Sequence, residues 1–176
     1  MTANKVFDAL LVLQYQAGDK TALGILVKRY HNKFCSHAYW YTHDFDASKD
    51  IVQDCWGIII KKLGNLSDPN CFSSWALRII TRKSLDFLNQ NKSKRGKLKQ
   101  FHQAKYEIIL EDDNNPDLVG LHVAIRSLSK NQQIVLRLFY TQEYSLIEIS
   151  EILDISIGTV KSRLFHSREK LKTILK

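Results

Sequence analysis

The residues of this chain with the clearest chemistry lie near its C-terminus, where positions 156–176 carry six cations and one carboxylate. Lysine and arginine side chains at this density attract phosphates, and they also donate hydrogen bonds to base edges in the major groove of DNA. On a helix, this segment would turn a polar face outward. The segment therefore predicts a nucleic-acid contact. The outward side chains are Thr159, Lys161, Ser162, Arg163 and His166.

The preceding residues predict how this segment is held. Ser145 and Glu148 form a capping box, in which each side chain satisfies a free backbone N–H at a helix start. Asp154 stands where the chain must turn through a left-handed conformation, which Asp tolerates better than most non-glycine residues, and Ser156 is a candidate cap for the next helix. This pattern indicates a helix-turn-helix, with a solvated bundle helix as the alternative. The predicted buried stripes are Ile149, Ile152 and Leu153, then Val160, Leu164 and Leu171.

Composition agrees with this interpretation. The chain has 176 residues, 44% of them hydrophobic, which is enough for one domain or two small ones. Its formal charge of +8 favours an anionic partner, but the charge by itself is compatible with nucleic acid, a membrane surface or neither. We find no signal-peptide pattern and no apolar run that would span a bilayer, so we expect a cytoplasmic protein without a membrane partner.

Metal binding and catalysis find little support. The chain has three cysteines, which is an odd number, and no two of them form a Cys-x-x-Cys pair: Cys35, Cys55 and Cys71. We therefore expect reduced thiols. His31 lies four residues before Cys35, but two ligands do not make a metal site. The sequence contains no Gly-rich phosphate loop, nucleophile elbow or zinc-binding His-Glu-x-x-His motif. We therefore expect no catalytic residues, metal, cofactor or small-molecule substrate.

Apolar residues recur at helical spacing along most of the chain, so we expect an all-α protein. In the N-terminal half they predict helices over 23–38, 52–63 and about 74–89, with a loop over 64–73 that is rich in Asn, Ser, Asp and Pro. The candidate caps of the second helix are Asp46 and Ser48.

A change in composition separates two helical domains. The run KSKRGKLK holds five cations and EDDNNPD is acidic and turn-rich, so residues 92–117 have little to bury and are expected to form a flexible linker. We expect a small helical domain over 1–91 and a four-helix domain with the helix-turn-helix over 118–176.

The run HDFDASKDIVQDCW at 43–56 resembles the most recognisable segment of the extracytoplasmic-function (ECF) group of bacterial RNA polymerase sigma factors. The runs QAGDKTALGILVKRY, FSSWALRIITRKSLDFL, LSKNQQIVLRLFY and GTVKSRL are similar to further segments of the family, in the family's order. The resemblance covers about residues 10–90 and 118–172. The positions that match the first segment are Asp50, Val52, Gln53, Asp54 and Trp56.

The resemblance implies that residues 1–91 form sigma region 2 and 118–176 form sigma region 4. In this family, the first segment docks on the clamp helices of the largest catalytic subunit of core RNA polymerase. Region 4 is expected to meet the flap region of the second large subunit. The core-binding residues would be Asp50, Gln53 and Asp54, with Ile51 beneath them.

The resemblance also implies two contacts with promoter DNA. Region 2 would read the −10 element as a melted single strand with a flipped base, and the helix-turn-helix would read the −35 element. The −10 candidates are Asn65, Ser67, Asn70, Phe72, Ser73, Arg78, Arg82 and Lys83, while Trp75 is expected in the core. The −35 candidates are Thr159, Lys161, Ser162, Arg163 and His166, with Arg168 nearer the backbone.

These implications predict an alternative sigma factor that directs promoter-specific initiation and is regulated from outside, as by an anti-sigma factor. Arg82 stands where the family usually has an asparagine near the flipped base, which puts the −10 preference in doubt. A helix-turn-helix regulator that does not bind polymerase is the alternative, and it leaves the DIVQD segment unexplained.

Overall fold

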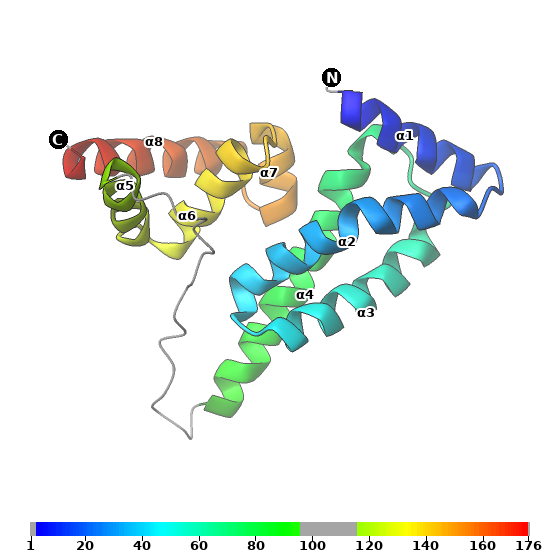
Figure 1. The fold of residues 1–176 in the computed structure, drawn as a ribbon, viewed down its shortest axis with the longest axis horizontal. Helices are drawn as coiled ribbons and strands as arrows, with labels where there is room; N and C mark the ends of the chain where they lie inside the picture. The colour runs from blue at the N-terminus through cyan, green and yellow to red at the C-terminus, as the bar shows by residue number, and fades with distance from the viewer. Residues whose placement is uncertain (1–2, 96–115, 176) are drawn as a thin grey trace. The chain divides into compact units, whose positions relative to one another are not determined.

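The computed structural model describes residues 3–95 and 116–175, and all the regular structure in these ranges is helical. The chain divides into two compact units, one N-terminal and one C-terminal (Figure 1). This confirms the all-α fold with two small domains that the hydrophobic periodicity predicts.

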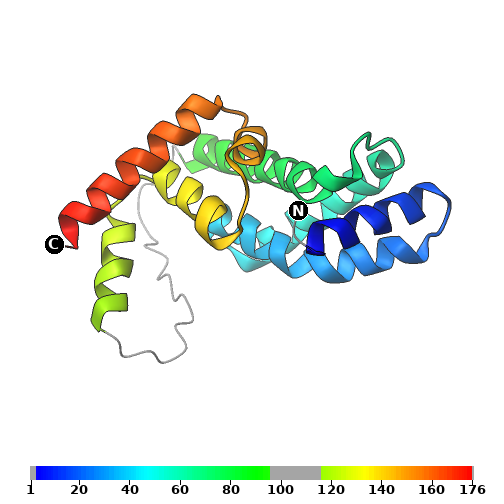
Figure 2. The ribbon, with the colours of Figure 1, turned by 90° about the horizontal axis from the view of Figure 1, so that it is seen from above.

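The N-terminal unit is a bundle of four helices. Helix α1 (Ala3–Gln16) lies beside α2 (Thr21–Thr42), as Figures 1 and 2 both show. Helix α2 also packs against α3 (Phe45–Leu63) and α4 (Phe72–Arg95). A short 3₁₀ turn, η1 (Pro69–Cys71), precedes α4 and packs against α1. The loop between α3 and α4 is therefore held by the first helix of the chain.

Local capping sets the start of α3. The Asp44 side chain accepts a hydrogen bond from the backbone N–H of Ala47 at 3.1 Å. The two predicted caps are therefore wrong, because Asp46 lies inside the first turn and Ser48 is buried. The Ser48 hydroxyl donates to the carbonyl of Asp44 instead, and its oxygen lies 2.8 Å from the hydroxyl oxygen of Thr42, which joins the end of α2 to the start of α3.

Helix α4 is longer than its apolar stripe predicts. It begins at Phe72, inside the segment predicted as a loop, and it continues to Arg95, past the predicted linker start at Lys92. Asp68 explains the earlier start, because its carboxylate accepts from the backbone N–H of Asn70 at 3.0 Å and so caps the turn that leads into α4. The rest of the predicted linker, residues 96–115, lies outside the described residues.

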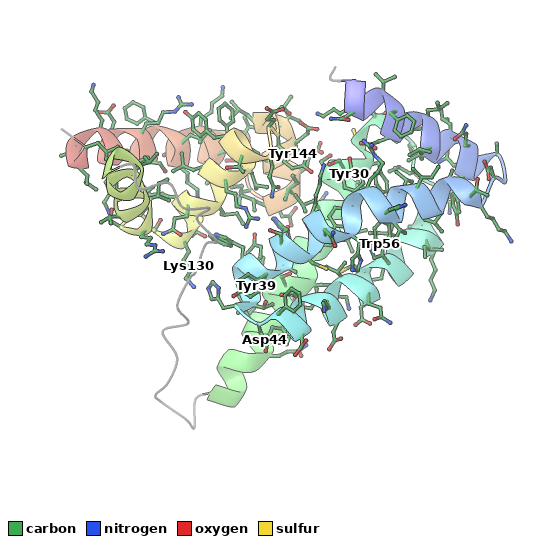
Figure 3. All side chains as sticks on the ribbon, in the orientation of Figure 1. Tyr30, Tyr39, Asp44, Trp56, Lys130 and Tyr144 are labelled. Atoms are coloured by element: carbon green, nitrogen blue, oxygen red, sulfur yellow. The ribbon has the colours of Figure 1, made fainter. Side chains whose placement is uncertain are left out.

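Aromatic side chains from three helices meet in the core of this unit. The ring centroid of Phe34 on α2 lies 5.2 Å from that of Tyr30 and 5.5 Å from that of Trp56 on α3. The Tyr30 ring also meets Phe72 of α4 nearly edge-on, at 5.3 Å. Figure 3 labels Tyr30 and Trp56 on their helices. Each such pair contributes about 0.5–1.5 kcal/mol beyond the burial of apolar area.

A buried carboxylate joins α1 to α2. Asp8 is almost fully buried, and it accepts one hydrogen bond from the hydroxyl of Tyr30 and another from Arg29 Nε at 2.9 Å. These two donors offset the cost of removing the charge from water. They therefore fix how α1 lies along α2.

A buried histidine joins α2 to α4. His37 Nε2 lies 2.9 Å from the hydroxyl oxygen of Thr81, and that hydroxyl donates its proton to the carbonyl of Leu77 at 2.8 Å. The hydroxyl has one proton, so it accepts from His37, and Nε2 carries the imidazole proton.

The C-terminal unit is the four-helix domain predicted from the sequence. It consists of α5 (Pro116–Arg126), α6 (Lys130–Leu136), α7 (Leu146–Leu153) and α8 (Ile157–Ile174). Helix α8 packs against the other three. A π-helical turn, η2 (Arg137–Thr141), extends α6, which the sequence does not predict.

The helix-turn-helix forms as its local signals predict. Ser145 Oγ accepts from the Glu148 N–H at 3.3 Å, and Glu148 Oε2 accepts from the Ser145 N–H at 2.9 Å. Asp154 ends α7 in the left-handed conformation, with φ 57° and ψ 46°. Ser156 then caps α8 by accepting from the Thr159 N–H at 3.1 Å.

The buried stripe of the helix-turn-helix differs from prediction at its edges. Ile149, Ile152, Val160 and Leu164 are buried as predicted. Leu153 and Leu171 are only half-buried, and the small side chain of Ser167 is fully buried in the stripe of α8. Its hydroxyl donates to the Arg163 carbonyl at 2.6 Å, so it is satisfied within the helix.

The backbone at Asp154 generates a stability prediction. Replacing Asp154 with Val should lower the free energy of unfolding of the C-terminal unit by about 1–2 kcal/mol, because a β-branched residue is disfavoured at positive φ. Asp154→Gly should be neutral or stabilising. Urea unfolding followed by NMR signals of α7 and α8 would measure both, with Glu151→Val on the exposed face of α7 as control. Equal losses in the three variants would contradict this explanation.

Candidate nucleic-acid and protein interfaces

One face of α3 carries a polar group of side chains that is available to a partner. Asp50, Gln53 and Asp54 are all exposed, and their spacing of three and four residues brings them to one side of the helix. Ile51, which was predicted beneath them, is buried, so it supports this face from the core. The resulting surface combines two carboxylates with an amide, which suits a partner rich in arginine.

An aromatic residue that the sequence reasoning missed adjoins this face. Phe45 begins α3, is 61% exposed, and lies under the ammonium group of Lys49, with Lys49 Nζ 4.2 Å from the ring centroid. Lys49 is one turn from Gln53 on the same helix. An aromatic residue four positions before a lysine is the signal that would have indicated this pair.

The loop between α3 and α4 presents several polar groups. Asn65 and Ser67 are exposed, as is Asn70. Asn70 Nδ2 donates to Asp68 Oδ1 at 2.9 Å, and the Cys71 thiol donates to Asp68 Oδ2 at 3.1 Å. These bonds, the thiol's first, lower the pKa of the Asp68 carboxyl. Asp68 therefore keeps its charge and orders the second half of the loop.

The predicted −10 residues of α4 lie at three different depths in the structure. Phe72 is fully buried among the core aromatics, so its predicted contact with a base is wrong. Ser73 and Arg78 are half-buried, whereas Arg82 and Lys83 are exposed. Trp75 is half-buried and its ring lies 6.4 Å from that of Phe72, so it borders the core.

The cysteines lie at different depths in the N-terminal unit. Burial raises the pKa of the Cys55 thiol to about 12, and it also raises the pKa of Cys35. His31 Nε2 and Cys35 Sγ share a helix face and lie 3.6 Å apart. Within 3–95 and 116–175, no three His, Cys, Asp or Glu side chains are grouped to hold a metal.

Helix α8 presents the predicted −35 residues at different depths. Lys161, Ser162 and His166 are exposed, while Arg163 is half-buried. Thr159 is also half-buried, and its hydroxyl lies 2.8 Å from that of the capping Ser156. Thr159 thus belongs to the helix cap as well as to the candidate surface.

Phe165 is a second exposed aromatic residue that the sequence reasoning missed. It is 60% exposed and lies one turn beyond Lys161 and Ser162 on the same face of α8. Phe165 falls outside the apolar stripe that Val160 and Leu164 form at helical spacing, and this position would have indicated that its side chain faces outward. An apolar ring on a helix of this kind can contact a thymine methyl group.

Arg168 takes part in contacts that the sequence does not predict. Its Nε donates to the hydroxyl of Tyr140 at 2.8 Å. Its guanidinium carbon also lies 5.7 Å from the ring centroid of Phe139 and 5.6 Å from that of Tyr140. The π-turn therefore holds the Arg168 guanidinium at a set position beside α8.

Together, these features define a two-domain helical protein with a helix-turn-helix in its C-terminal unit. Known families share this organisation. The family "Sigma-70 region 2" matches residues 26–94, and "Sigma-70, region 4" matches residues 118–171.

None of the helices in the described ranges is both long and apolar enough to cross a membrane.

Curated relatives are similar over nearly the whole chain. The ECF RNA polymerase sigma-E factor of Haemophilus influenzae is 26% identical over 97% of this chain and 96% of its own length. The ECF sigma factor SigW of Bacillus subtilis is 27% identical over 94% and 95%. The chain belongs to the ECF group of RNA polymerase sigma factors, and it is a factor for transcription initiation rather than an enzyme.

Solved structures share the fold. CnrH, solved in complex with the cytosolic domain of CnrY, has a TM-score of 0.65 and 22% identity over 96% of this chain and 97% of its own. The sigma factor RpoE of Bartonella quintana, solved with the anti-sigma factor NepR, has a TM-score of 0.63 and 19% identity over 87% and 96%.

The contacts of Arg168 generate a prediction. Arg168→Lys keeps the charge but removes the Nε donor and the planar stacking, so amides of α8 and the π-turn should lose about 1 kcal/mol of protection against hydrogen exchange. Tyr140→Phe should lose less, because the ring remains. Lys172→Ala, on the exposed side of α8, serves as control. Unchanged protection in Arg168→Lys would show that these contacts do not stabilise the unit.

Proposed function

We propose that this sigma factor binds core RNA polymerase through the exposed face of α3. The observation that carries this proposal is the grouping of Asp50, Gln53 and Asp54 on one face of a helix whose opposite side is anchored by Ile51 and Trp56 in the core. Such a rigid acidic face suits the clamp helices of the largest subunit, where arginines would form charge-assisted hydrogen bonds. The exposed Phe45 would add an aromatic contact at its edge.

The second part of the proposal is that the loop between α3 and α4 reads the −10 element as a single strand. Asn65, Ser67 and the carbonyl oxygen of Asn70 offer polar groups to a flipped base, while Arg82 and Lys83 would bind phosphates. Phe72 acts from the core by holding the loop's end. Because Arg82 replaces the family's usual asparagine, the base preference should differ from that of relatives with the asparagine.

The third part is that α8 reads the −35 element in the major groove. Lys161, Ser162 and Phe165 form an exposed group, and His166 and Arg163 follow it on the Ser162 side of the helix, Arg163 half-buried. Lys161 and Arg163 can donate hydrogen bonds to guanine or phosphate, and Phe165 can contact a thymine methyl group. Region 4 would also meet the flap region of the second large subunit.

An anti-sigma factor is the proposed regulator. This proposal rests on the likeness of fold to RpoE of Bartonella quintana, which was solved with its anti-sigma factor NepR. A helix-turn-helix regulator that does not engage polymerase is the competing function. The match to sigma region 2 over residues 26–94 favours the sigma factor, because a regulator that only binds duplex DNA does not require that domain.

The proposed docking face generates a binding prediction. In a pull-down with core RNA polymerase, Asp50→Ala combined with Gln53→Ala should weaken binding at least about tenfold, because losing a charge-assisted hydrogen bond costs about 1.5 kcal/mol or more. Asp86→Ala, an exposed carboxylate on α4, is the matched control. Failure of the unmodified protein to bind core polymerase would refute the proposed function.

The proposed −35 reading generates a second prediction. Lys161→Ala and Arg163→Ala in the holoenzyme should each reduce discrimination between a cognate and a base-substituted −35 duplex, since a base contact contributes about 1–3 kcal/mol. Lys172→Ala should leave discrimination unchanged. An equal loss on every sequence, with a shallower dependence on salt, would reassign the residue to a phosphate contact.

A further inference from the structure

The loop between α3 and α4 begins where a helix end leaves carbonyl groups without helical partners. The last four carbonyls of an α-helix have no N–H donor within the helix. Here the N–H of Asn65 donates to the Lys62 carbonyl at 3.0 Å, and the N–H of Leu66 donates to the Leu63 carbonyl at 3.2 Å. The first bond closes a tight turn over 62–65 and the second closes an overlapping turn over 63–66, with Asn65 exposed on both. Such a short turn needs further support to keep one position.

The support comes from a side chain almost fifty residues earlier. Gln16 Nε2 donates to the Leu63 carbonyl at 3.1 Å and to the Leu66 carbonyl at 3.0 Å. The amide therefore joins both ends of the turn. Both partners are acceptors, so only the NH₂ end of the amide fits there, and the orientation of the side chain is settled.

The position of Gln16 is itself fixed at the end of α1. Its helix ends at Gln16 itself, and the chain then turns at Gly18, whose φ of 104° suits glycine and whose N–H donates to the Tyr15 carbonyl at 3.0 Å. The same helix is tied to α2 through the buried Asp8 and the hydroxyl of Tyr30. The Gln16 amide is thus delivered to the loop by a rigid element.

We propose that Gln16 is a positioning residue for −10 recognition. Its amide holds the turn over 63–66 so that Asn65 and Ser67 meet the flipped base at one orientation. This inference rests on the proposed reading of the −10 strand by this loop. Gln16 is half-buried and acts through the backbone, so it need not touch DNA.

The test uses holoenzyme assembled with the full-length sigma factor. The probes are single-stranded oligonucleotides with the −10 sequence of a promoter on which the unmodified holoenzyme initiates, together with a set that substitutes each base in turn. Gln16→Met keeps the side chain's length but has no donor. Gln14→Ala, an exposed glutamine on the same helix, is the matched control.

In Gln16→Met, the ratio of cognate to substituted binding should fall roughly tenfold, because two hydrogen bonds that order the loop are lost. Core binding and −35 duplex discrimination by Gln16→Met should stay unchanged. Gln14→Ala should keep the unmodified protein's ratio of cognate to substituted −10 binding. Discrimination equal to the unmodified protein's, or equal weakening on every oligonucleotide, would overturn the positioning role. An unmodified holoenzyme without any −10 preference would instead refute the proposed −10 reading, and Gln16's role with it.

Discussion

The contact among four aromatic rings in the N-terminal unit is the constraint on which its outer surfaces depend. Phe72 at the start of α4 meets Tyr30, Tyr30 meets Phe34, and Phe34 meets Trp56 of α3. Trp56 lies less than one turn from Gln53 on the candidate docking face, and Phe72 ends the candidate −10 loop. A shift of one ring would therefore move both surfaces, because a densely packed core transmits displacement.

Tyr30 gives this cluster a second role. Its ring packs in the aromatic core while its hydroxyl donates to the buried Asp8 of α1. Since α1 delivers Gln16 to the other end of the same loop, the loop is held from both of its ends by contacts that converge on one tyrosine. The loop combines exposed polar side chains with a fixed backbone, which is what recognition of a base without prior rearrangement needs.

The sequence predicted those parts of the fold that local chemistry determines. The Ser145–Glu148 capping box, the left-handed Asp154 and the Ser156 cap each depend on residues within a few positions, and all form as predicted. The centres of the α7 and α8 stripes are also buried as predicted, whereas Leu153 and Leu171 at their edges are only half-buried. The Asp44 cap was missed because Asp46 and Ser48 are equally good caps by residue type. The sequence misjudged the role of Phe72 and missed the contacts of Gln16 and Arg168. The contacts of all three join residues 28 to 50 positions apart.

Region 2 must present surfaces of opposite charge from one small bundle. The candidate docking face on α3 carries Asp50 and Asp54, while the neighbouring α4 carries the exposed Arg82 and Lys83. Packed helix axes lie about 8–10 Å apart, which is close to one Debye length at physiological salt, so the two fields are only partly screened from each other. The apolar core between α3 and α4 lets the exposed faces turn in different directions. In the proposed function, the charge sign of each face would select its partner: arginine-rich protein for the α3 face and phosphate for the α4 face.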